Sequence, residues 1–520
     1  AGHALAMRPS RTGGGLLLFL YAAKSGYGLQ SSLLPVPWFS TAARTSLCHR
    51  PGFPPRPTHF HATTDDIADT ESVQAESKGD TRPQDMRRRS LLAEACKAAV
   101  VTGASSLGLI AGGPQPAYAS FDGAQWPLWP ALPLAPYGKR KTIRREASPN
   151  KVWVFDQMFG VFYVHVPIRM TVVAMQDGKG LFVYAPVAPT KECLRLLQPL
   201  IQAHGPVKYI VLPSVAPEHK VLAGPFARKF PEAEFYTTNA QYSFPLNLPT
   251  IFLGFPGNPK PLPASSEGQG ELWGGEFEHE ILTVKASKNS IYQDAAFFHK
   301  PSGTLMVCDA IVSTSPEPPA ILTSEPEYVR ALLYHARDDP LELVKDTPEV
   351  RRKGWQRIVL FANFFMPGSL INLENDVWLA AAPKSPMPEL GWAGVLPFTW
   401  RESTTRAFEA FSDDGKPTVA PIIQIILSRN PEATKQWIDK ICTWRFDKVI
   451  PAHFDAPLGI GPEAFRGAFG FITAGKNEVR FCDEDVAFIR DQIDGLEATP
   501  DLALYKTPLG SLKGKDCRLV

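Results

Sequence analysis

Four side chains that can hold a metal or move a proton follow three apolar, strand-like runs. Glu218 and His219 come after "VKYIVLP" (207–213), Asp309 directly follows "GTLMVC" (303–308), and His453 follows "KVIPA" (448–452). Imidazole and carboxylate groups bind zinc, iron and manganese, and both can act as general bases. If these strand ends meet at one edge of a sheet, the four residues predict a metal site there.

Taken singly, each candidate also has a simpler interpretation. A Glu-His pair in a polar loop is typical of a capped turn as well as of a ligand pair, and Cys308 on its apolar run is either an extra thiolate ligand or a small core residue. His165 and His299 lie inside strand-like runs and are interpreted as structural, whereas His335 either lines the pocket or caps a helix. Arg169 either attracts an anionic substrate or lies on a solvated surface.

The elements that would position these residues alternate between strands and helices. Strand-rich residues 152–187 include the hairpin signal "DGKG" (177–180), and a helix over 190–204, a strand over 207–213, a short helix and a strand over 233–238 follow. Strands resume over 279–312, and a helix with Asn430 as its cap precedes "KVIPA". This alternation predicts an α/β (α+β) fold with helices packed on sheets, interrupted at about 313–420 by a partly helical insertion.

The three loops resemble those of the metallo-β-lactamase superfamily, an αββα sandwich that holds metals through an HxHxDH loop, a further His, a bridging Asp and a last His. The resemblance makes Asp309 the bridging Asp and His453 the last His, over a domain spanning residues 151–520. The HxHxDH loop becomes "SVAPEHK" (214–220), so its four ligand positions are occupied by Ser214, Ala216, Glu218 and His219.

The superfamily's ligands are lost selectively. Both histidines of the loop are replaced, and no His occurs near Ser290, where the third His would lie by spacing. These three hold the first metal in the superfamily. The ligands of the second metal are kept, with Glu218 in place of Asp. The resemblance therefore implies one divalent metal, held by Glu218, His219, Asp309 and His453, with zinc as the first candidate and iron or manganese after it.

Two functions follow from one remaining metal. A metal that polarises a carbonyl and activates water implies a metallohydrolase-like protein acting on an ester, amide or thioester of a small molecule. Phosphodiester cleavage ranks lower, because one metal would have to stabilise both the attacking and the leaving oxygen. Redox chemistry ranks lower still, because the resemblance implies that it would normally use two irons in this fold. The alternative is a non-catalytic lumenal protein that binds a partner or assists assembly on a degenerate metallo-β-lactamase scaffold.

A narrower resemblance covers roughly residues 150–475. The segments "HVPIRMTVV", "VYAPVAPTKECLRLL", "PSVAPEHKVLAGPFARKFP", "LLYHARDDP" and "PAHFDAP" resemble an uncharacterised family of plants, algae and cyanobacteria, domain of unknown function 4336. That family brings no known activity, so the function has to be inferred from the site.

Two targeting signals in series precede the globular part. Residues 1–64 lack Asp and Glu but carry six Lys or Arg among small and hydroxyl residues, which is typical of a plastid transit peptide. In residues 65–119, a spacer is followed by "RRRS" (87–90), an apolar run and "AYA" (117–119), which form a twin-arginine lumenal signal. We therefore expect a chloroplast protein of the thylakoid lumen. The alternatives are a disordered N-terminus with a chance Arg run, or residues 98–121 kept as an anchor.

Composition excludes several classes of partner and site. Without residues 1–119 the chain has 42 basic and 44 acidic residues, so we expect no nucleic-acid partner, and we find no integral membrane span in the mature chain. The proline-rich residues 120–150 are predicted to be a linker. No GxSxG, P-loop or dinucleotide motif occurs in the right context. The cysteines follow no metal or disulfide spacing, and a Cys482–Cys517 bridge is left open.

Overall fold

The computed structural model describes ten stretches of the chain. They are residues 134–136, 139–161, 163–241, 254–257, 259–267, 272–285, 291–390, 394–473, 478–497 and 513–517. The transit peptide and the lumenal signal predicted for residues 1–119 lie outside the described residues. Among the described helices, none combines the length and the apolar character needed to cross a membrane.

The first sheet is mixed and has eight strands in the order β1-β3-β4-β5-β6-β7-β8, with β2 beside β3. Its strands are β1 (Leu134–Ala135), β2 (Ile143–Ser148), β3 (Val152–Val161), β4 (Val164–Ala174), β5 (Leu181–Tyr184), β6 (Val207–Leu212), β7 (Glu234–Thr237) and β8 (Lys260–Pro261). β2 to β5 pair antiparallel and β5 to β8 pair parallel. β2 falls inside the predicted linker 120–150, so the sheet begins before residue 151. Its polar, largely exposed residues are typical of an edge strand.

The second sheet has four strands in the order β14-β11-β10-β9. They are β9 (Phe277–Lys285), β10 (Ile291–His299), β11 (Thr304–Val307) and β14 (Lys448–Pro451). β9, β10 and β11 form an antiparallel meander, and β14 joins β11 in parallel after the insertion. This parallel pair matters for the site because both strands end at the same edge.

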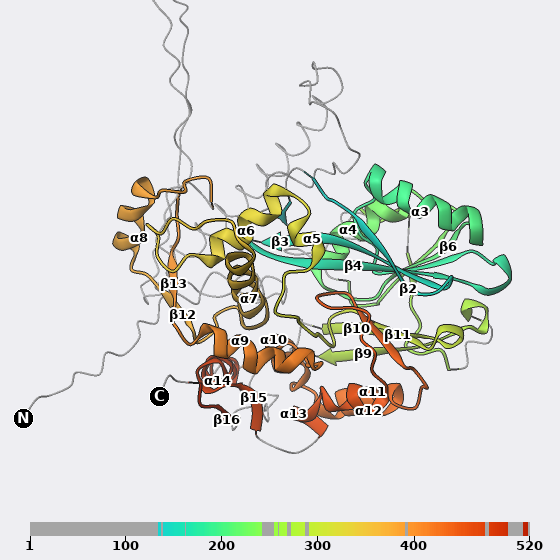
Figure 1. The fold of residues 1–520 in the computed structure, drawn as a ribbon. Coiled ribbons are helices and arrows are strands. Elements are labelled where there is room, and N and C mark those ends of the chain that lie inside the picture. Colours follow the sequence, from blue (N-terminus) through green and yellow to red (C-terminus); the bar gives the residue numbers. More distant parts are fainter. Residues whose placement is uncertain are drawn as a thin grey trace, which may run out of the picture. The chain divides into compact units, whose positions relative to one another are not determined.

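Helices cover the outer face of each sheet, as Figure 1 shows. α3 (Lys191–His204) and α4 (Pro217–Ala227) pack on the first sheet, and α11 (Pro431–Ile441) packs on β9, followed by α12 (Pro462–Gly467) and α13 (Gly470–Thr473). α3 begins where the Thr190 hydroxyl accepts the Cys193 amide, and α11 begins where Asn430 accepts the Ala433 amide, as predicted. The predicted αββα sandwich is confirmed.

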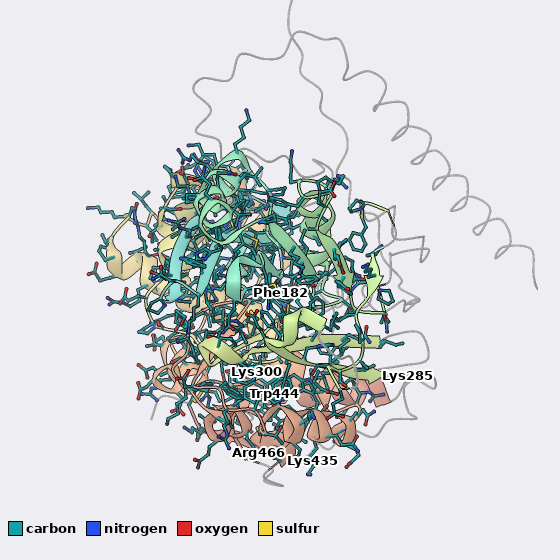
Figure 2. The ribbon with its side chains drawn as sticks, turned by 90° about the vertical axis from the view of Figure 1, so that its right-hand side faces the viewer. Phe182, Lys285, Lys300, Lys435, Trp444 and Arg466 are labelled. Atoms are coloured by element: carbon teal, nitrogen blue, oxygen red, sulfur yellow. A yellow bond between two sulfur atoms is a disulfide. The ribbon has the colours of Figure 1, made fainter. Side chains whose placement is uncertain are left out.

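Alternate residues of β3 separate two apolar layers. Trp153 and Phe155 face α3 and α4, whereas Val152 and Val154 face the second sheet. Between the sheets Phe182 stacks on Phe277 with ring centroids 4.4 Å apart, and Figure 2 places Phe182 well inside the molecule. In the same figure Lys435 and Arg466 lie at the periphery, where both pair with Asp439.

The remaining elements lie in the insertion and the C-terminal part. In residues 313–420 they are α5 (Ala320–Thr323), α6 (Pro326–Ala336), α7 (Pro348–Phe364), β12 (Leu370–Asn372), α8 (Asn375–Ala381), β13 (Phe398–Trp400) and α9 (Thr404–Ser412). After it come α10 (Pro421–Leu427), β15 (Glu478–Cys482), α14 (Asp483–Glu497) and β16 (Lys513–Lys515). Short 3-10 turns are η1 (Gln176–Gly178), η3 (Leu272–Gly275), η4 (Lys300–Ser302), η5 (Ala382–Lys384) and η6 (Asp413–Gly415). A disulfide joins Cys482 to Cys517.

Candidate metal centre

The register of β11 and β14 brings Asp309 and His453 together. Val307 is the direct partner of Pro451 in this parallel pair, and the two candidate ligands each lie two residues further along. The backbone amide of Ala452 donates to the Cys308 carbonyl at 3.2 Å, which continues the pairing past the strand ends. Two residues that the insertion separates in sequence are thus neighbours in space.

The first turn of α4 supplies the other two ligands. Pro217 takes the first helical position, where a missing amide costs nothing, and Glu218 and His219 follow it. The loop before α4 is tied to the second sheet, because the Ala295 amide donates to the Pro213 carbonyl at 2.8 Å and Ser214 bridges to Asp294. The start of α4 is therefore fixed relative to β10 and β11.

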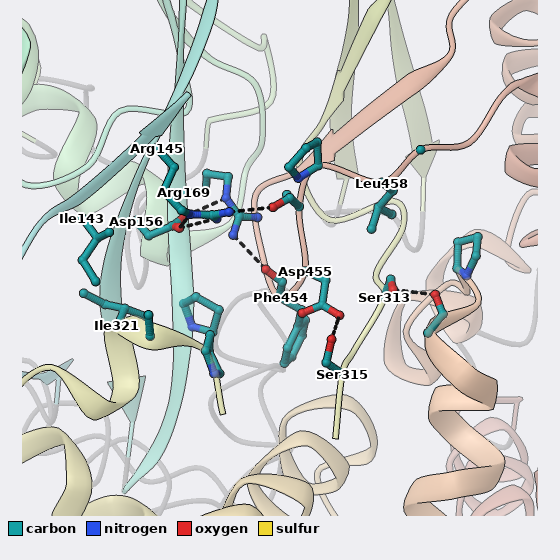
Figure 3. A pocket seen from close by; sticks show the side chains of 18 of the residues that line it. Ile143, Arg145, Asp156, Arg169, Ser313, Ser315, Ile321, Phe454, Asp455 and Leu458 are labelled. Carbon is teal, nitrogen blue, oxygen red and sulfur yellow. Dashed lines mark hydrogen bonds and ion pairs between the residues drawn. The ribbon is translucent and has the colours of Figure 1, made fainter. Parts of the chain in front are cut away.

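A buried guanidinium fixes the loop that carries His453. Arg169, only 2% exposed, donates to the Pro451 carbonyl at 2.8 Å. It also donates to the Phe454 carbonyl at 2.8 Å and to Asp156 at 2.7 Å (Figure 3). The expectation that Arg169 lies on the surface or attracts substrate at the site is therefore replaced by a structural role. Removing this side chain would leave two buried carbonyls without their donors.

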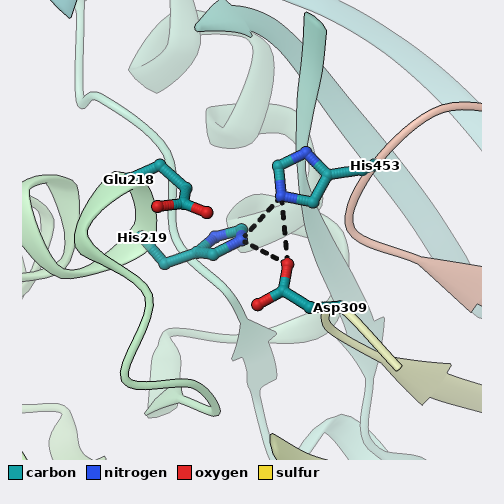
Figure 4. A group of neighbouring side chains, drawn as sticks. All are labelled: Glu218, His219, Asp309 and His453. Atoms are coloured by element: carbon teal, nitrogen blue, oxygen red, sulfur yellow. Dashed lines mark hydrogen bonds and ion pairs between the residues drawn. The ribbon is translucent and has the colours of Figure 1, made fainter. Parts of the chain in front are cut away.

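The four candidate side chains converge, as Figure 4 shows. The Nε2 atoms of His219 and His453 are 3.2 Å apart. Asp309 Oδ1 lies 3.3 Å from Nε2 of His453 and 4.0 Å from Nε2 of His219. With a carboxylate oxygen of Glu218, one ligand atom from each residue lies within 4.8 Å of all the others. His219 and His453 are buried, and the two carboxylates are partly exposed.

This arrangement fits one small divalent metal. Two ligand atoms at about 2.0–2.1 Å from a tetrahedral metal lie about 3.4 Å from each other. The distance between the two Nε2 atoms and the distance from Asp309 Oδ1 to His453 Nε2 are both close to this value. The third distance, 4.0 Å, closes with a small rotation of His219 or Asp309. His453 Nδ1 lies 2.9 Å from the Pro167 carbonyl, and a proton donated there leaves Nε2 as the free lone pair, as metal-binding histidines require.

The negative charge of Asp309 affects the pKa of its neighbour His453. Burial acts to lower the pKa of His453, but its hydrogen bond with Asp309 and the negative charge of that carboxylate outweigh burial, so the pKa of His453 is raised above its usual value. The site therefore favours a positive charge between Nε2 of His453 and Oδ1 of Asp309. A bound cation would meet the same preference.

The second oxygen of Asp309 is occupied by a hydroxyl. Ser214 Oγ donates to Asp309 Oδ2 at 3.0 Å and accepts the Ala216 amide at 3.1 Å. By the resemblance, Ser214 takes the position of a first-metal histidine. A hydrogen bond thus occupies the carboxylate oxygen of Asp309 that does not face the two histidines.

Asp294 is a functional candidate that the sequence did not reveal. Its fully buried carboxylate accepts the backbone amides of Cys308, Asp309 and Ala310 at 3.1, 2.7 and 2.9 Å. Burial and then the charge of Asp309 raise the pKa of Asp294 to about 7, although the three amides act in the opposite direction. It shapes the turn that presents Asp309. The only signal was an acidic residue at the start of the apolar run "DAAFF".

Of the other candidates, Cys308 directly precedes Asp309, and the three remaining histidines lie outside the four-residue group. Cys308 belongs to the core between the sheets, and burial raises the pKa of its thiol well above the usual value, so we assign it to packing. His165 and His299 are buried at strand positions, and His335 is buried in the last turn of α6. Ser290 and the missing third His position lie outside the described residues.

The layers and the site define a mixed α/β protein whose structural neighbours have the metallo-β-lactamase fold. DIM-1 metallo-β-lactamase is 12% identical, with 37% of this chain and 81% of that chain aligned and a TM-score of 0.25. The mono-zinc form of FIM-1 from Pseudomonas aeruginosa is 11% identical, with 42% and 95% aligned and a TM-score of 0.25. The metal-soaked Flv1 flavodiiron core from Synechocystis is 9% identical, with 72% of each chain aligned and a TM-score of 0.32.

The chain belongs to the family described as domain of unknown function (DUF4336), whose model matches residues 149–471. The match confirms the narrower of the two resemblances and nearly reproduces its predicted bounds. Among curated proteins, no sequence matches the chain. Because structural similarities with TM-scores this low carry no functional inference, the chemistry has to rest on the side chains of this chain.

Proposed function

We propose that this chain is a mononuclear metallohydrolase that cleaves a small ester, amide or thioester. The main support for this proposal is that the two oxygens of Asp309 have different partners. Oδ1 faces the Nε2 atoms of the two histidines, whereas Oδ2 accepts a hydrogen bond from Ser214. One carboxylate oxygen and two imidazoles make the three-ligand set typical of catalytic zinc, which leaves a further position open.

When bound, the metal would polarise a carbonyl and lower the pKa of a water to about 7. The chain's own groups supply the rest. His219, Asp309 and His453 hold the ion, and the Pro167 carbonyl keeps His453 in the right tautomer. Glu218, which the resemblance counts among the ligands, is a partly exposed carboxylate within 4.8 Å of the other three ligand atoms, so we assign it instead the proton taken from the attacking water.

Metal content tests the site directly. The purified full chain, exchanged against zinc and then against buffer, should retain about one equivalent by elemental mass spectrometry. His219→Ala and His453→Ala should each retain none. His335→Phe is the matched control, since it changes a buried histidine outside the group and should keep the metal. An unmodified chain that retains no metal would overturn the proposal.

Activity separates a hydrolase from a scaffold that merely binds metal. The zinc-loaded chain should hydrolyse 4-nitrophenyl esters or acyl thioesters faster than His453→Ala. Glu218→Gln should keep the metal but lose about 100-fold or more in kcat, the usual contribution of a general base. Metal retention without turnover of any ester, amide or thioester would favour the alternative, a non-catalytic binding protein. The loss of the first-metal ligands is the feature that favours that alternative.

A further inference from the structure

A cavity lies beside the loop that carries His453. Its volume is about 570 Å³, within the range of small-molecule sites. Its walls come from β2 to β4, the start of the insertion near Ser315, residues 415–417, and the loop 454–460, as Figure 3 shows. Ligands bind preferentially at such junctions between substructures, here between the sandwich and its insertion.

Much of the wall is apolar. It includes Ile143, Pro319, Ile321, Pro417, Phe454 and Leu458. These side chains come from segments far apart in the sequence, and the ring of Phe454 packs against Trp355 from α7, with ring centroids 6.0 Å apart. Several proline residues stiffen the wall, so the hollow is preformed. A wall of this kind favours a ligand with an apolar body.

The charged groups on the wall are arranged unequally. Asp156 accepts from Arg169 through Oδ1 at 2.7 Å and from Arg145 through Oδ2 at 2.6 Å, so a single carboxylate lies between two guanidinium groups. Arg169 is buried and directs its remaining groups to backbone carbonyls. This group therefore keeps an excess positive charge, and Arg145, whose side chain is 43% exposed, presents it to the cavity and solvent.

Arg145 has N–H groups that its protein partners do not use. It uses Nε and Nη2 on Asp156 and Nη1 on the Ala456 carbonyl at 3.0 Å, and these three bonds leave two of its five N–H groups for a ligand. The other acidic side chain of the wall, Asp455, lies across the cavity in Figure 3, where it accepts from Ser315 Oγ at 2.6 Å. The cavity is thus polarised, with its accessible cation at the Arg145 end.

We propose that this cavity binds a small organic anion, a carboxylate or sulfonate on an apolar body, with Arg145 meeting the charge and the proline- and isoleucine-rich wall meeting the body. None of the four candidate metal ligands lines the cavity. The proposal therefore does not depend on the metal and can fail or succeed separately from it.

Calorimetric titration of the full chain with octanoate tests the proposal. Octan-1-ol, with the same body and no charge, and octylammonium, with the opposite charge, are the matched probes. Octanoate should bind at least about tenfold more tightly than either, as a charge-assisted contact to a guanidinium implies. Sodium octanesulfonate distinguishes recognition of carboxylate geometry from recognition of negative charge, and both outcomes lie within the proposed class.

The neighbouring arginine of β2 provides the control variant. Arg145→Met should weaken octanoate binding about tenfold or more and leave octan-1-ol unchanged. Arg144→Met removes the same charge from the adjacent residue, which instead bonds to the Leu196 carbonyl, and should change octanoate binding less than twofold. Asp156 keeps its bond with Arg169 in both variants, so the fold should persist, which circular dichroism checks.

Three results would overturn the proposal. They are no octanoate binding at millimolar concentration, equal binding of octanoate and octan-1-ol, and an Arg145→Met variant that binds octanoate as well as the unmodified chain. If Arg145→Met does not fold, Arg145→Lys serves instead. It keeps the charge but loses the planar fork, so a several-fold weakening is expected, and unchanged binding would contradict the role given to Arg145.

Discussion

Two pairs of buried histidines, among those that the structure describes, differ in what surrounds them. His219 and His453 meet at the edge of the sandwich with ring centroids 5.1 Å apart, and Asp309 lies against their Nε2 atoms. His165 on β4 and His335 on α6 lie where the insertion packs on the first sheet, close enough to repel each other if charged. Burial is similar in the two groups, so burial does not distinguish a ligand pair from a core pair.

The difference lies in the neighbouring charges. Burial lowers the pKa of His165 and of His335 to about 3, and the ring of His335 is stacked on Phe398 within a group of aromatic side chains. At His453 the same burial is outweighed by Asp309, and its pKa is raised. Neighbouring carboxylates, Asp309 first and Glu218 after it, thus convert an environment that rejects a cation into one that favours it.

The largest expected effect is the loss of the Asp309 carboxylate charge. Asp309→Asn keeps the shape of the side chain but removes a charged ligand, so zinc affinity should fall by more than about 100-fold, beyond the usual cost of losing a residue that only supports a ligand. Competition with a fluorescent zinc chelator measures the change. His335→Phe should leave the affinity within twofold, and a similar loss in both variants would show that the two histidine groups are not distinct.

The next largest effect is expected at Asp294, whose carboxylate holds the turn that presents Asp309. At pH 8, above the pKa of about 7 of Asp294, the substitution Asp294→Asn keeps one acceptor oxygen but loses the charge that holds three amides, and it places an NH₂ group against them. We expect zinc affinity to fall about 10- to 100-fold and the free energy of unfolding to fall by about 2–3 kcal/mol. Chelator competition and urea unfolding measure the two quantities. A stability loss with unchanged affinity would limit Asp294 to a structural role.

Acid sensitivity should come from the second histidine group. His335 has a pKa of about 3 in the fold and about 6.5 when unfolded, so the unfolded state binds its proton first and stability falls as the pH drops below about 6.5. At pH 5 this costs about 2 kcal/mol. His335→Phe should therefore lose about 2 kcal/mol less than the unmodified chain between pH 7 and pH 5 in urea unfolding. Between pH 7 and pH 8 the difference between the two proteins should stay constant, and equal losses at pH 5 would contradict the assignment.

Sequence reasoning found the four converging residues because a family resemblance marked three strand ends. It found the αββα layers because apolar alternation and helix caps are local signals, as at Asn430. It missed β2, whose residues are mostly polar because the strand lies at an edge of the sheet and is largely exposed. Edge strands of this kind carry no apolar alternation to recognise.

Two further features depend on contacts that no local pattern records. Asp294 acts through its hydrogen bonds to three amides of the turn after β11, and a sequence shows only one acidic residue in an apolar run. Arg145 on β2 and Arg169 on β4 lie on either side of Asp156 on β3, and their role depends on that carboxylate and on the loop after β14. The cavity beside that loop is assembled from four parts of the chain, so it became visible only in three dimensions.

The smallest expected effect concerns the replaced first-metal position. Ser214→Ala removes one hydrogen bond to Asp309 Oδ2 and the acceptor of the Ala216 amide, so we expect a loss of about 1 kcal/mol in the free energy of unfolding. Zinc affinity should change only a few-fold, and the stoichiometry should stay at one, because Oδ1 and both imidazoles are untouched. Elemental analysis of the variant beside the unmodified chain checks the count. Two equivalents in the variant would mean that the Ser214 hydroxyl is what blocks a second ion, whereas one equivalent means that the missing histidines alone exclude it.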